Sequence, residues 1–260
     1  ACRDGTRAVR SRGRLPPRRA RRRRGRRAAE RPRAVRALVR RAVAGPVVRE
    51  ILDAWLLDQD GKLKPQYVIS ELQKATDGEA IVATDVGQHQ MTTSRYYKYK
   101  NPRTNVTSGG AGTMGFALPA ALGAKLALPD KQVIAVIGDG GYQMTVQELG
   151  TIMQYEIPVK IMVLNNSFLG MVRQWQQLFH EKRYSSTEMV NPNFIKIAEA
   201  YNIPALKVEK REDLQGAIRQ MLDSKTAFFV EVVVGKEDNV FPMVPAGGCV
   251  SDCMLEPPAI

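Results

Sequence analysis

The chain has 260 residues, of which 44% are hydrophobic and 25% are charged. Such a length and composition allow one large globular domain with a sizeable apolar core. No run of about 18 apolar residues occurs, so the sequence predicts no membrane span, and its start lacks the apolar region of a secretory signal. Cys2, Cys249 and Cys253 are too few and too scattered for a disulfide framework or a metal site, so we expect a reduced, cytoplasmic environment.

The net charge of +13 belongs to one segment of the chain. Residues 1–49 contain 19 arginines, no lysine and two acids, which gives this segment a net charge of +17 and leaves the remainder at −4. The segment has no hydrophobic period, so it cannot bury enough apolar surface to offset its ordering entropy. We therefore predict a disordered or non-native leader at 1–49, followed by a linker at 50–63.

Three interpretations of the leader are open. A basic arm for nucleic acid would neutralise phosphates, but no aromatic residue interleaves the arginines for base stacking. An organelle transit peptide would be rich in arginine and poor in acids, but Ser11 is the only serine of the segment. Alternatively, the segment is GC-rich DNA translated in a wrong frame, which would give arginine without lysine. We favour this third interpretation, under which nucleic-acid binding and organelle targeting are not expected.

Strands and helices alternate from about Lys62 onward. In chain order we expect a strand at 81–84, a helix at 114–128, a strand at 133–137, a helix at 145–155, a strand at 159–164, helices at 168–179 and 193–201, a strand at 205–208, a helix at 211–222 and a strand at 228–234. The strand at 133–137 is entirely apolar, which indicates a sheet covered on both faces. This alternation predicts an α/β fold with a doubly wound parallel sheet.

Four polar or glycine-rich loops follow strands of this sheet or precede its helices. They comprise residues 85–89, 109–112, 138–141 and the pair Asn165-Asn166. In doubly wound sheets, ligands bind beyond the carboxyl ends of the strands. We therefore expect the four loops to converge on one ligand site at that edge.

The loop at 138–141 suggests phosphate and magnesium chemistry. Glycines after a strand let backbone amides approach a phosphate. A carboxylate among them, Asp139, and an amide at the next strand end, Asn166, are oxygen ligands that Mg²⁺ accepts alongside phosphate oxygens. Taken singly, Asp139 is equally well explained as a helix cap and Asn166 as a turn residue.

Taken together, these residues resemble the thiamine-diphosphate motif. Gly138-Asp139-Gly140 is followed, after 24 residues, by Asn165-Asn166. The spacing is one strand-loop-helix-loop-strand unit, which places both ends at neighbouring strands. The resemblance implies that Asp139 and Asn166 bind Mg²⁺ through their side chains and Phe168 through its carbonyl.

Four further runs resemble the large, catalytic subunit of acetolactate synthase (acetohydroxyacid synthase). They are TDVGQHQM at 84–91, SGGAGTMGFALPAALGAK at 108–125, YQMTVQEL at 142–149 and GMVRQWQ at 170–176. FPMVPAG at 241–247 also resembles the C-terminal segment of that family. The resemblance implies a thiamine-diphosphate-binding domain at 64–245 and a C-terminal tail at 246–260.

The resemblance also implies a role for each site residue. The residues expected to bind the cofactor are Val86, Gly87, Gln88, His89, Gly112, Met114, Asp139, Gly140, Gly141, Asn166, Phe168, Leu169, Gly170 and Met171. Three residues are expected to serve the reaction: Met144 bends the cofactor, Met171 contacts the thiazolium and the substrate, and Trp175 shapes the pocket for the second 2-oxo acid. From the residues alone, Met144 and Met171 could be core methionines, and Trp175 could pack on Met171 at helical spacing.

The implied reaction condenses pyruvate with pyruvate or 2-oxobutyrate and releases CO2, at the start of branched-chain amino-acid biosynthesis. The implied cofactors are thiamine diphosphate, Mg²⁺ and, in the full-length family, FAD, whose main site we do not find here. The implied partners are further copies of the chain and a small regulatory subunit. The glutamate that activates the cofactor in the family has no counterpart, because Glu50, Glu71 and Glu148 lie in the wrong regions. We therefore expect a truncated or frame-shifted chain that is inactive alone.

Three other functions stay open at this stage. The chain could be another thiamine-diphosphate carboligase or oxidase, or one subunit of an enzyme whose pyrimidine-binding half is a separate chain. From a different class of protein, it could be an Arg-rich nucleic-acid-binding protein that uses residues 1–49.

Overall fold

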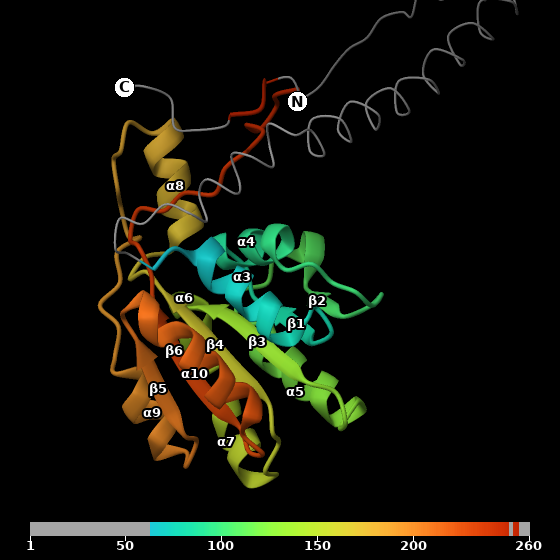
Figure 1. The fold of residues 1–260 in the computed structure, drawn as a ribbon. Coiled ribbons are helices and arrows are strands. Elements are labelled where there is room, and N and C mark those ends of the chain that lie inside the picture. Colours follow the sequence, from blue (N-terminus) through green and yellow to red (C-terminus); the bar gives the residue numbers. More distant parts are fainter. Residues whose placement is uncertain (1–62, 250–251, 255–260) are drawn as a thin grey trace, which may run out of the picture.

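The computed structural model describes residues 63–249 and 252–254. The predicted leader, almost all of the predicted linker and the end of the tail lie outside these residues. The described chain forms one six-stranded parallel sheet with the strand order β2-β1-β3-β4-β6-β5 (Figure 1). The strands are β1 (Ile81–Thr84), β2 (Asn105–Thr107), β3 (Val133–Gly138), β4 (Lys160–Asn165), β5 (Ala205–Val208) and β6 (Phe228–Val233).

Helices cover both faces of this sheet, as Figure 1 shows. One face packs against α5 (Ala117–Ala127), α6 (Asp139–Met144), α7 (Glu148–Gln154) and α9 (Phe194–Ala200). The other face packs against α3 (Pro65–Thr76) and α10 (Arg211–Asp223), with α4 (Gln88–Tyr96) beside α3. The predicted α/β fold with a doubly wound parallel sheet is thereby confirmed.

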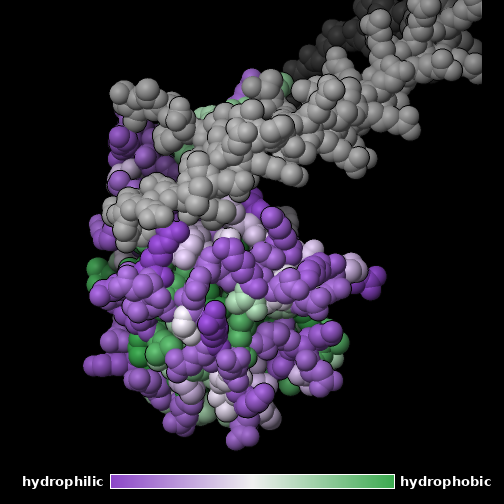
Figure 2. Space-filling model, viewed as in Figure 1, coloured by the Kyte–Doolittle hydropathy of each residue, from purple (hydrophilic) through white to green (hydrophobic). Residues whose placement is uncertain are grey.

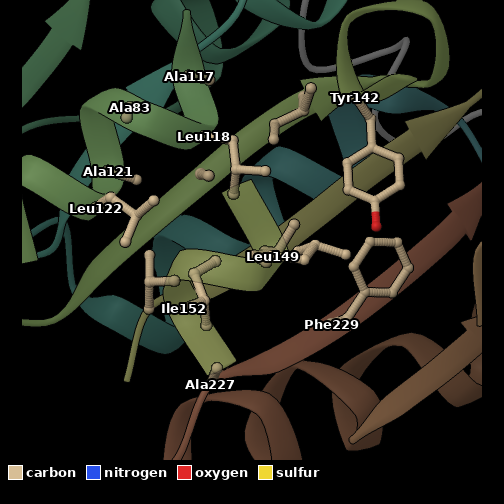
Figure 3. Close-up of a cluster of buried hydrophobic side chains, with 14 of the residues drawn as sticks. Ala83, Ala117, Leu118, Ala121, Leu122, Tyr142, Leu149, Ile152, Ala227 and Phe229 are labelled. Atoms are coloured by element: carbon tan, nitrogen blue, oxygen red, sulfur yellow. The ribbon is translucent and has the colours of Figure 1, made fainter. Parts of the chain in front are cut away.

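Each face has its own apolar core. Figure 3 shows the core under α5, α6 and α7, where Leu149 lies beside the rings of Tyr142 and Phe229, and Leu118 and Leu122 belong to the same cluster on the side of α5. Every residue of β1, β3 and β4 is buried, as expected of strands covered on both faces. The face of the molecule seen in Figure 2 is mainly hydrophilic. Among the helices in residues 63–249, none combines the length and the apolar character that a bilayer crossing needs.

Lys160 is the one charged residue in these three buried strands. Its Nζ donates a hydrogen bond of 2.8 Å to the carbonyl of Ser224 and a second one to the carbonyl of Thr226. Burial lowers the pKa of this ammonium to about 8, and the nearby Lys125 and Lys225 act in the same direction. The ammonium is therefore hydrogen-bonded to backbone carbonyls at the amino end of β4. That end of the strand lies opposite the ligand-binding edge of the sheet.

The strand order contains a switch point between β1 and β3. From β1 the chain passes to β2 on one side and then returns to β3 on the other side. At such a point the loops that follow the two strands lead away to opposite faces, which leaves a crevice at the carboxyl edge. The loop after β1 begins at Asp85, and the loop after β3 becomes α6 at Asp139. The fold therefore places the crevice between the two polar runs that the sequence singles out.

Several predicted elements differ from the observed ones. The helix predicted at 114–128 begins only at Ala117, because Gly115 turns the backbone with a φ of +84°. The helix predicted at 145–155 is the shorter α7. The preceding helix, α6, was missed because two of its residues are glycines, which are poor helix formers. The helix predicted at 168–179 begins at Gly170 as α8 (Gly170–Phe179). The sequence analysis predicted no element at α3, α4 or β2.

Candidate functional site

A cavity of about 180 Å³ opens at the carboxyl edge of the sheet. It lies between the loops that follow β1, β3 and β4, so three of the four predicted loops converge, whereas the loop at 109–112 contributes no lining residue. Most of the predicted cofactor-binding residues line it: Val86, Gly87, Gln88, His89, Met114, Asp139, Gly140, Gly141, Asn166, Phe168, Leu169, Gly170 and Met171. The structure thus brings these residues together, and what each of them binds stays a prediction.

The remaining predicted site residues do not line this cavity. Gly112 lies in the exposed turn after the short 3-10 helix Gly109–Ala111, with a φ of +58°. Met144 ends α6 and is 51% exposed. Trp175 is 39% exposed, and its ring packs on Phe179 of the same helix at a centroid distance of 4.9 Å. Any contact of these three residues with a cofactor or a substrate stays a prediction.

Asp139 begins α6 directly after β3, and only 2% of it is exposed. Its Oδ1 accepts a hydrogen bond of 3.1 Å from the backbone N–H of Gly140, and its Oδ2 accepts one of 2.7 Å from Nδ2 of Asn191. Burial raises the pKa of Asp139, while the hydrogen bonds from Asn191 and Gly140 act in the opposite direction. The carboxylate is therefore held in a fixed orientation at the edge of the cavity.

Asn166 follows β4, the strand next to β3. Its Oδ1 accepts a hydrogen bond of 3.1 Å from the backbone N–H of Phe168, and its Nδ2 donates one of 3.3 Å to Oε1 of Gln88. Between them, Ser167 has a φ of +58°, which turns the chain sharply toward α8. Within residues 63–249, no backbone N–H donates to the carbonyl of Phe168. In the described part of the chain, that oxygen therefore keeps its lone pairs for a ligand such as a cation.

Two glycines are needed because neighbouring side chains come very close. A Cβ on Gly170 would overlap Oε1 of Gln88 and would lie 2.7 Å from Nδ2 of Asn166. A Cβ on Gly141 would overlap Oδ2 of Asp85. Any larger residue at either position would displace a polar side chain of the site. These glycines therefore keep room for the polar groups that surround the cavity.

His89 lines the cavity from the first turn of α4, and its Nε2 is buried without a hydrogen-bond partner in the described part of the chain. Its ring lies against Gly138, where a Cβ would fall 2.9 Å from Nδ1. Burial lowers the pKa of His89 to about 4, against a smaller opposing effect of the Asp85 carboxylate. The imidazole is therefore neutral at pH 7, and an unpartnered buried nitrogen beside a cavity is suited to a polar ligand.

The arrangement can bind a hard cation together with an anion. Asp139, Asn166 and the carbonyl of Phe168 offer oxygen atoms from two neighbouring strand ends, which is the donor type that Mg²⁺ accepts. Beside them, the glycines at 138, 140 and 141 leave backbone open to the cavity. The residues present therefore fit a diphosphate with its magnesium ion.

Sequence reasoning missed four polar residues that support this site. Asp85, Gln143 and Gln174 lie within the family-like runs but were given no role there, and Asn191 lies outside all of these runs. Gln174 is fully buried and accepts a hydrogen bond of 2.9 Å from Nε2 of Gln88. The position of Asp85 directly after an apolar strand was the one available signal, because polar residues at such positions face the ligand-binding edge.

Comparisons with known proteins agree with this geometry. The family model described as "Thiamine pyrophosphate enzyme, C-terminal TPP binding domain" matches residues 85–232. The chain therefore belongs to this family. Thiamine pyrophosphate is another name for thiamine diphosphate. The match begins at Asp85 and ends within β6, so it contains the loops that line the cavity.

Within that family, the chain is similar to acetolactate synthases. It is 48% identical over 196 residues to the mitochondrial acetolactate synthase of Schizosaccharomyces pombe, covering 74% of this chain and 29% of that protein. It is 47% identical over 190 residues to the acetolactate synthase large subunit of Lactococcus lactis, covering 73% and 33%. It is 46% identical over 202 residues to acetolactate synthase 2, chloroplastic, of Nicotiana tabacum, covering 75% and 30%. The predicted resemblance is confirmed, and the chain spans about 30% of the length of these relatives.

Proposed function

We propose that the chain binds thiamine diphosphate and Mg²⁺ in this cavity as the C-terminal domain of an acetolactate synthase. The reaction is the condensation of pyruvate with pyruvate or 2-oxobutyrate with loss of CO2, at the start of branched-chain amino-acid biosynthesis. The observation that carries the proposal is the meeting of Asp139, Asn166 and Phe168 at one cavity, in a chain up to 48% identical to acetolactate synthases over the aligned residues.

The residues of the chain divide the work of binding. Asp139, Asn166 and the carbonyl of Phe168 hold the magnesium ion, and the backbone at Gly140 and Gly141 approaches the diphosphate. When bound, thiamine diphosphate would supply the group that accepts the electron pair of the carbon–carbon bond that breaks as CO2 leaves. The protein contributes orientation and the exclusion of water. Neutral His89 adds a nitrogen that hydrogen-bonds the cofactor without adding charge.

Substrates, further cofactors and partners are proposed from the relatives. The substrates are 2-oxo acids, and the assembly contains further copies of the chain with a small regulatory subunit. FAD belongs to the full-length enzyme, with its main site outside the residues matched here. The proposed domain runs from 64 to 245, with the tail at 246–260. Met144 and Trp175 act on the side of the site that faces a neighbouring domain, which accounts for their exposure in the described chain.

Calorimetric titration of the 260-residue chain with thiamine diphosphate tests the proposed function. We expect saturable binding in the presence of Mg²⁺ and its loss when a chelator removes the metal. Asp139→Asn is expected to abolish the Mg²⁺-dependent binding of thiamine diphosphate. Asp130→Asn, which neutralises an exposed loop carboxylate remote from the cavity, is the matched control. Binding that is equal with and without Mg²⁺ in the unmodified chain would reject the proposed metal site.

The alternative enzymes are separated by activity. The chain is mixed with pyruvate, 2-oxobutyrate, thiamine diphosphate, Mg²⁺ and FAD, with and without a separate chain that carries a pyrimidine-binding domain. Acetolactate formed only with the second chain supports the proposal. With phosphate and oxygen, or with glyoxylate, added to the same mixture, formation of acetyl phosphate or of a glyoxylate-derived product would instead indicate another thiamine-diphosphate enzyme.

The cytoplasmic location stays a prediction. The relatives from Schizosaccharomyces pombe and Nicotiana tabacum are named as mitochondrial and chloroplastic proteins. An organelle is therefore the alternative location for this chain. Microscopy of the 260-residue chain fused at its C-terminus to a fluorescent protein distinguishes the two, since a diffuse signal supports the cytoplasm.

A further inference from the structure

Asn191 lies at the centre of a polar network behind the candidate metal site. Its Nδ2 donates to Oδ2 of Asp139 at 2.7 Å and to Oδ1 of Asn165 at 2.9 Å. Its Oδ1 accepts a hydrogen bond of 3.0 Å from Nε2 of Gln143. Asn191 does not line the cavity, so it reaches the site only through these neighbours.

The orientation of the Asn191 amide is fixed by groups that cannot reverse their roles. An ionised carboxylate can only accept hydrogen bonds. The network ends at the carboxylates of Asp139 and Glu231, which therefore fix the orientation of the amides between them. Glu231 accepts from Nδ2 of Asn165 at 2.7 Å, which leaves Oδ1 of Asn165 facing the backbone N–H of Ser167 at 3.0 Å and Nδ2 of Asn191. The amide of Asn191 must therefore present its nitrogen to Asp139.

The backbone holds Asn191 in this place independently of its side chain. The segment before it runs antiparallel to the loop after β4, with hydrogen bonds of 2.8 Å from Leu169 N–H to the Thr187 carbonyl and 2.9 Å from Met189 N–H to the Ser167 carbonyl. Just after it, Asn193 caps α9 by accepting a hydrogen bond of 3.0 Å from the Lys196 N–H. The two backbone hydrogen bonds to the loop after β4 therefore anchor the segment that carries Asn191, whereas the cap belongs to the helix that follows.

These contacts give the two asparagines of the pair at 165–166 different functions. Asn166 lines the cavity, where the proposed function makes it a ligand of the magnesium ion. Asn165 lies away from the cavity and, with only 9% exposed, accepts from Asn191 and donates to Glu231. Asn166 therefore lies beside the proposed ligand, whereas Asn165 holds the side chain of Asn191 that orients Asp139.

We propose that Asn191 is a positioning residue for the magnesium site, which it serves by locking the Asp139 carboxylate in its binding orientation before the metal arrives. The proposal rests on the proposed function, since it assumes that Asp139 is a ligand. A carboxylate that is already ordered loses less side-chain freedom when it binds a cation. Hydrogen-bond partners of metal ligands commonly change metal affinity by about 10-fold to 100-fold when they are removed.

The test measures thiamine-diphosphate binding to the 260-residue chain as a function of Mg²⁺ concentration. For Asn191→Ala, we expect the half-saturating Mg²⁺ concentration to rise about 10-fold or more. At saturating Mg²⁺, we expect the dissociation constant of thiamine diphosphate to stay at the value of the unmodified chain. A purely structural role would weaken cofactor binding at every Mg²⁺ concentration, so this separation identifies positioning.

Two further variants make the test decisive. Gln143→Ala leaves Asn191 in place but removes the donor that holds its Oδ1, so the Mg²⁺ requirement should rise in the same direction by a smaller factor. Asn193→Ala removes the cap of α9 two residues away and should leave the Mg²⁺ requirement unchanged. If Asn191→Ala does not fold by near-ultraviolet circular dichroism, the Gln143→Ala result decides.

The outcomes separate this inference from the proposed function. An unchanged Mg²⁺ requirement in both Asn191→Ala and Gln143→Ala overturns the inference, as does an equal rise in Asn193→Ala. Loss of cofactor binding by Asn191→Ala at saturating Mg²⁺ also overturns it. Failure of the unmodified chain to bind thiamine diphosphate with Mg²⁺ would overturn the proposed function itself.

Discussion

Oδ2 of Asp85 occupies the space that a side chain on Gly141 would need. A Cβ built on Gly141 would overlap Oδ2 and would lie 2.8 Å from Cγ of Asp85. The other carboxylate oxygen accepts a hydrogen bond of 3.2 Å from the backbone N–H of Ala117, at the start of α5. Asp85 thus connects the end of β1 to α5 and packs directly against α6.

This relationship predicts that Gly141→Ala is destabilising. The added methyl group must displace the buried Asp85 carboxylate or shift α6, and overpacking of this kind costs about 1 to 3 kcal/mol. Urea unfolding of the chain measures the loss. The control is Gly123→Ala on α5, where a Cβ meets nothing within 4 Å. That change should instead stabilise the helix by about 0.5 to 1 kcal/mol. Equal effects at the two glycines would contradict the packing argument.

The strands could be predicted closely from the sequence because their signal is local. The apolar runs at β1 and β5 gave the observed bounds, and those at β3 and β4 were correct within one residue at each end. α6 was missed because Gly140 and Gly141 are poor helix formers. The helix is stabilised instead by tertiary packing of Tyr142 against Phe194 and Phe229. β2 was missed because its exposed residues at the sheet edge carry no apolar pattern.

The candidate site divides in the same way. The residues that line the cavity lie in short runs beside strand ends, so motif and topology could predict them. Asn191 and Gln174 are separated from their partners by 52 and 86 residues in the sequence. No local pattern records such a pairing, because amide side chains occur in every loop and helix. Met144 and Trp175 were assigned from the resemblance alone, and their side chains do not line the cavity of the described chain.

His89 should make the stability of the chain depend on pH in the mildly acidic range. Its folded-state pKa of about 4 is lower than the ordinary value of 6.5, because burial disfavours the charged ring. Between pH 6.5 and about pH 4, the unfolded chain therefore binds a proton at His89 that the folded chain does not bind. The resulting stability is present above pH 6.5 and is lost as the pH falls toward 4, by about 3 kcal/mol in all.

Urea unfolding at pH 7 and pH 4.5 measures this loss. His89→Asn should remove most of the pH dependence in this window, since it removes the titrating ring. The raised pKa of Asp139 instead favours the folded state as the pH falls. This contribution is the same in the unmodified chain and in His89→Asn, so it cancels in the difference between them. His180→Asn, which changes the exposed histidine of the described chain, should keep the full dependence. A dependence that survives His89→Asn would rule out His89 as its source.

Gln174 should fix the chain segment that follows β6 against α8. Its Nε2 donates a hydrogen bond of 3.1 Å to the carbonyl of Val240. Its Oε1 accepts one of 2.9 Å from the N–H of Val240 and another of 2.9 Å from Nε2 of Gln88. Gln174→Leu keeps the volume but leaves buried polar groups without partners, at about 1 to 3 kcal/mol for each such group. We expect hydrogen exchange of the Val240 N–H to accelerate by an order of magnitude or more.

The comparison variant for this experiment is Gln220→Leu on the exposed side of α10. It introduces the same change in polarity without breaking a buried network, so exchange at Val240 should stay as in the unmodified chain. Unchanged protection of Val240 in Gln174→Leu would show that the segment is held by its apolar contacts instead.

Trp175 and Met171 should differ in their effect on cofactor binding, although they lie one helical turn apart. Met171 lines the cavity, whereas Trp175 does not and packs on Phe179 with 39% of its surface exposed. Met171→Ala should therefore weaken the binding of thiamine diphosphate at saturating Mg²⁺. Trp175→Leu should leave that affinity unchanged and lower the stability by about 1 kcal/mol, because it loses one ring contact.

Calorimetric titration of both variants with thiamine diphosphate distinguishes these expectations. In a chain completed by a pyrimidine-binding domain, Trp175→Leu should then lower the preference for 2-oxobutyrate over pyruvate as the second substrate. Such a change without altered cofactor affinity would place Trp175 beside the substrate and away from the cofactor. Loss of cofactor affinity in Trp175→Leu would mean that α8 moves toward the cavity on binding, because the side chain does not line the cavity in the structure described here.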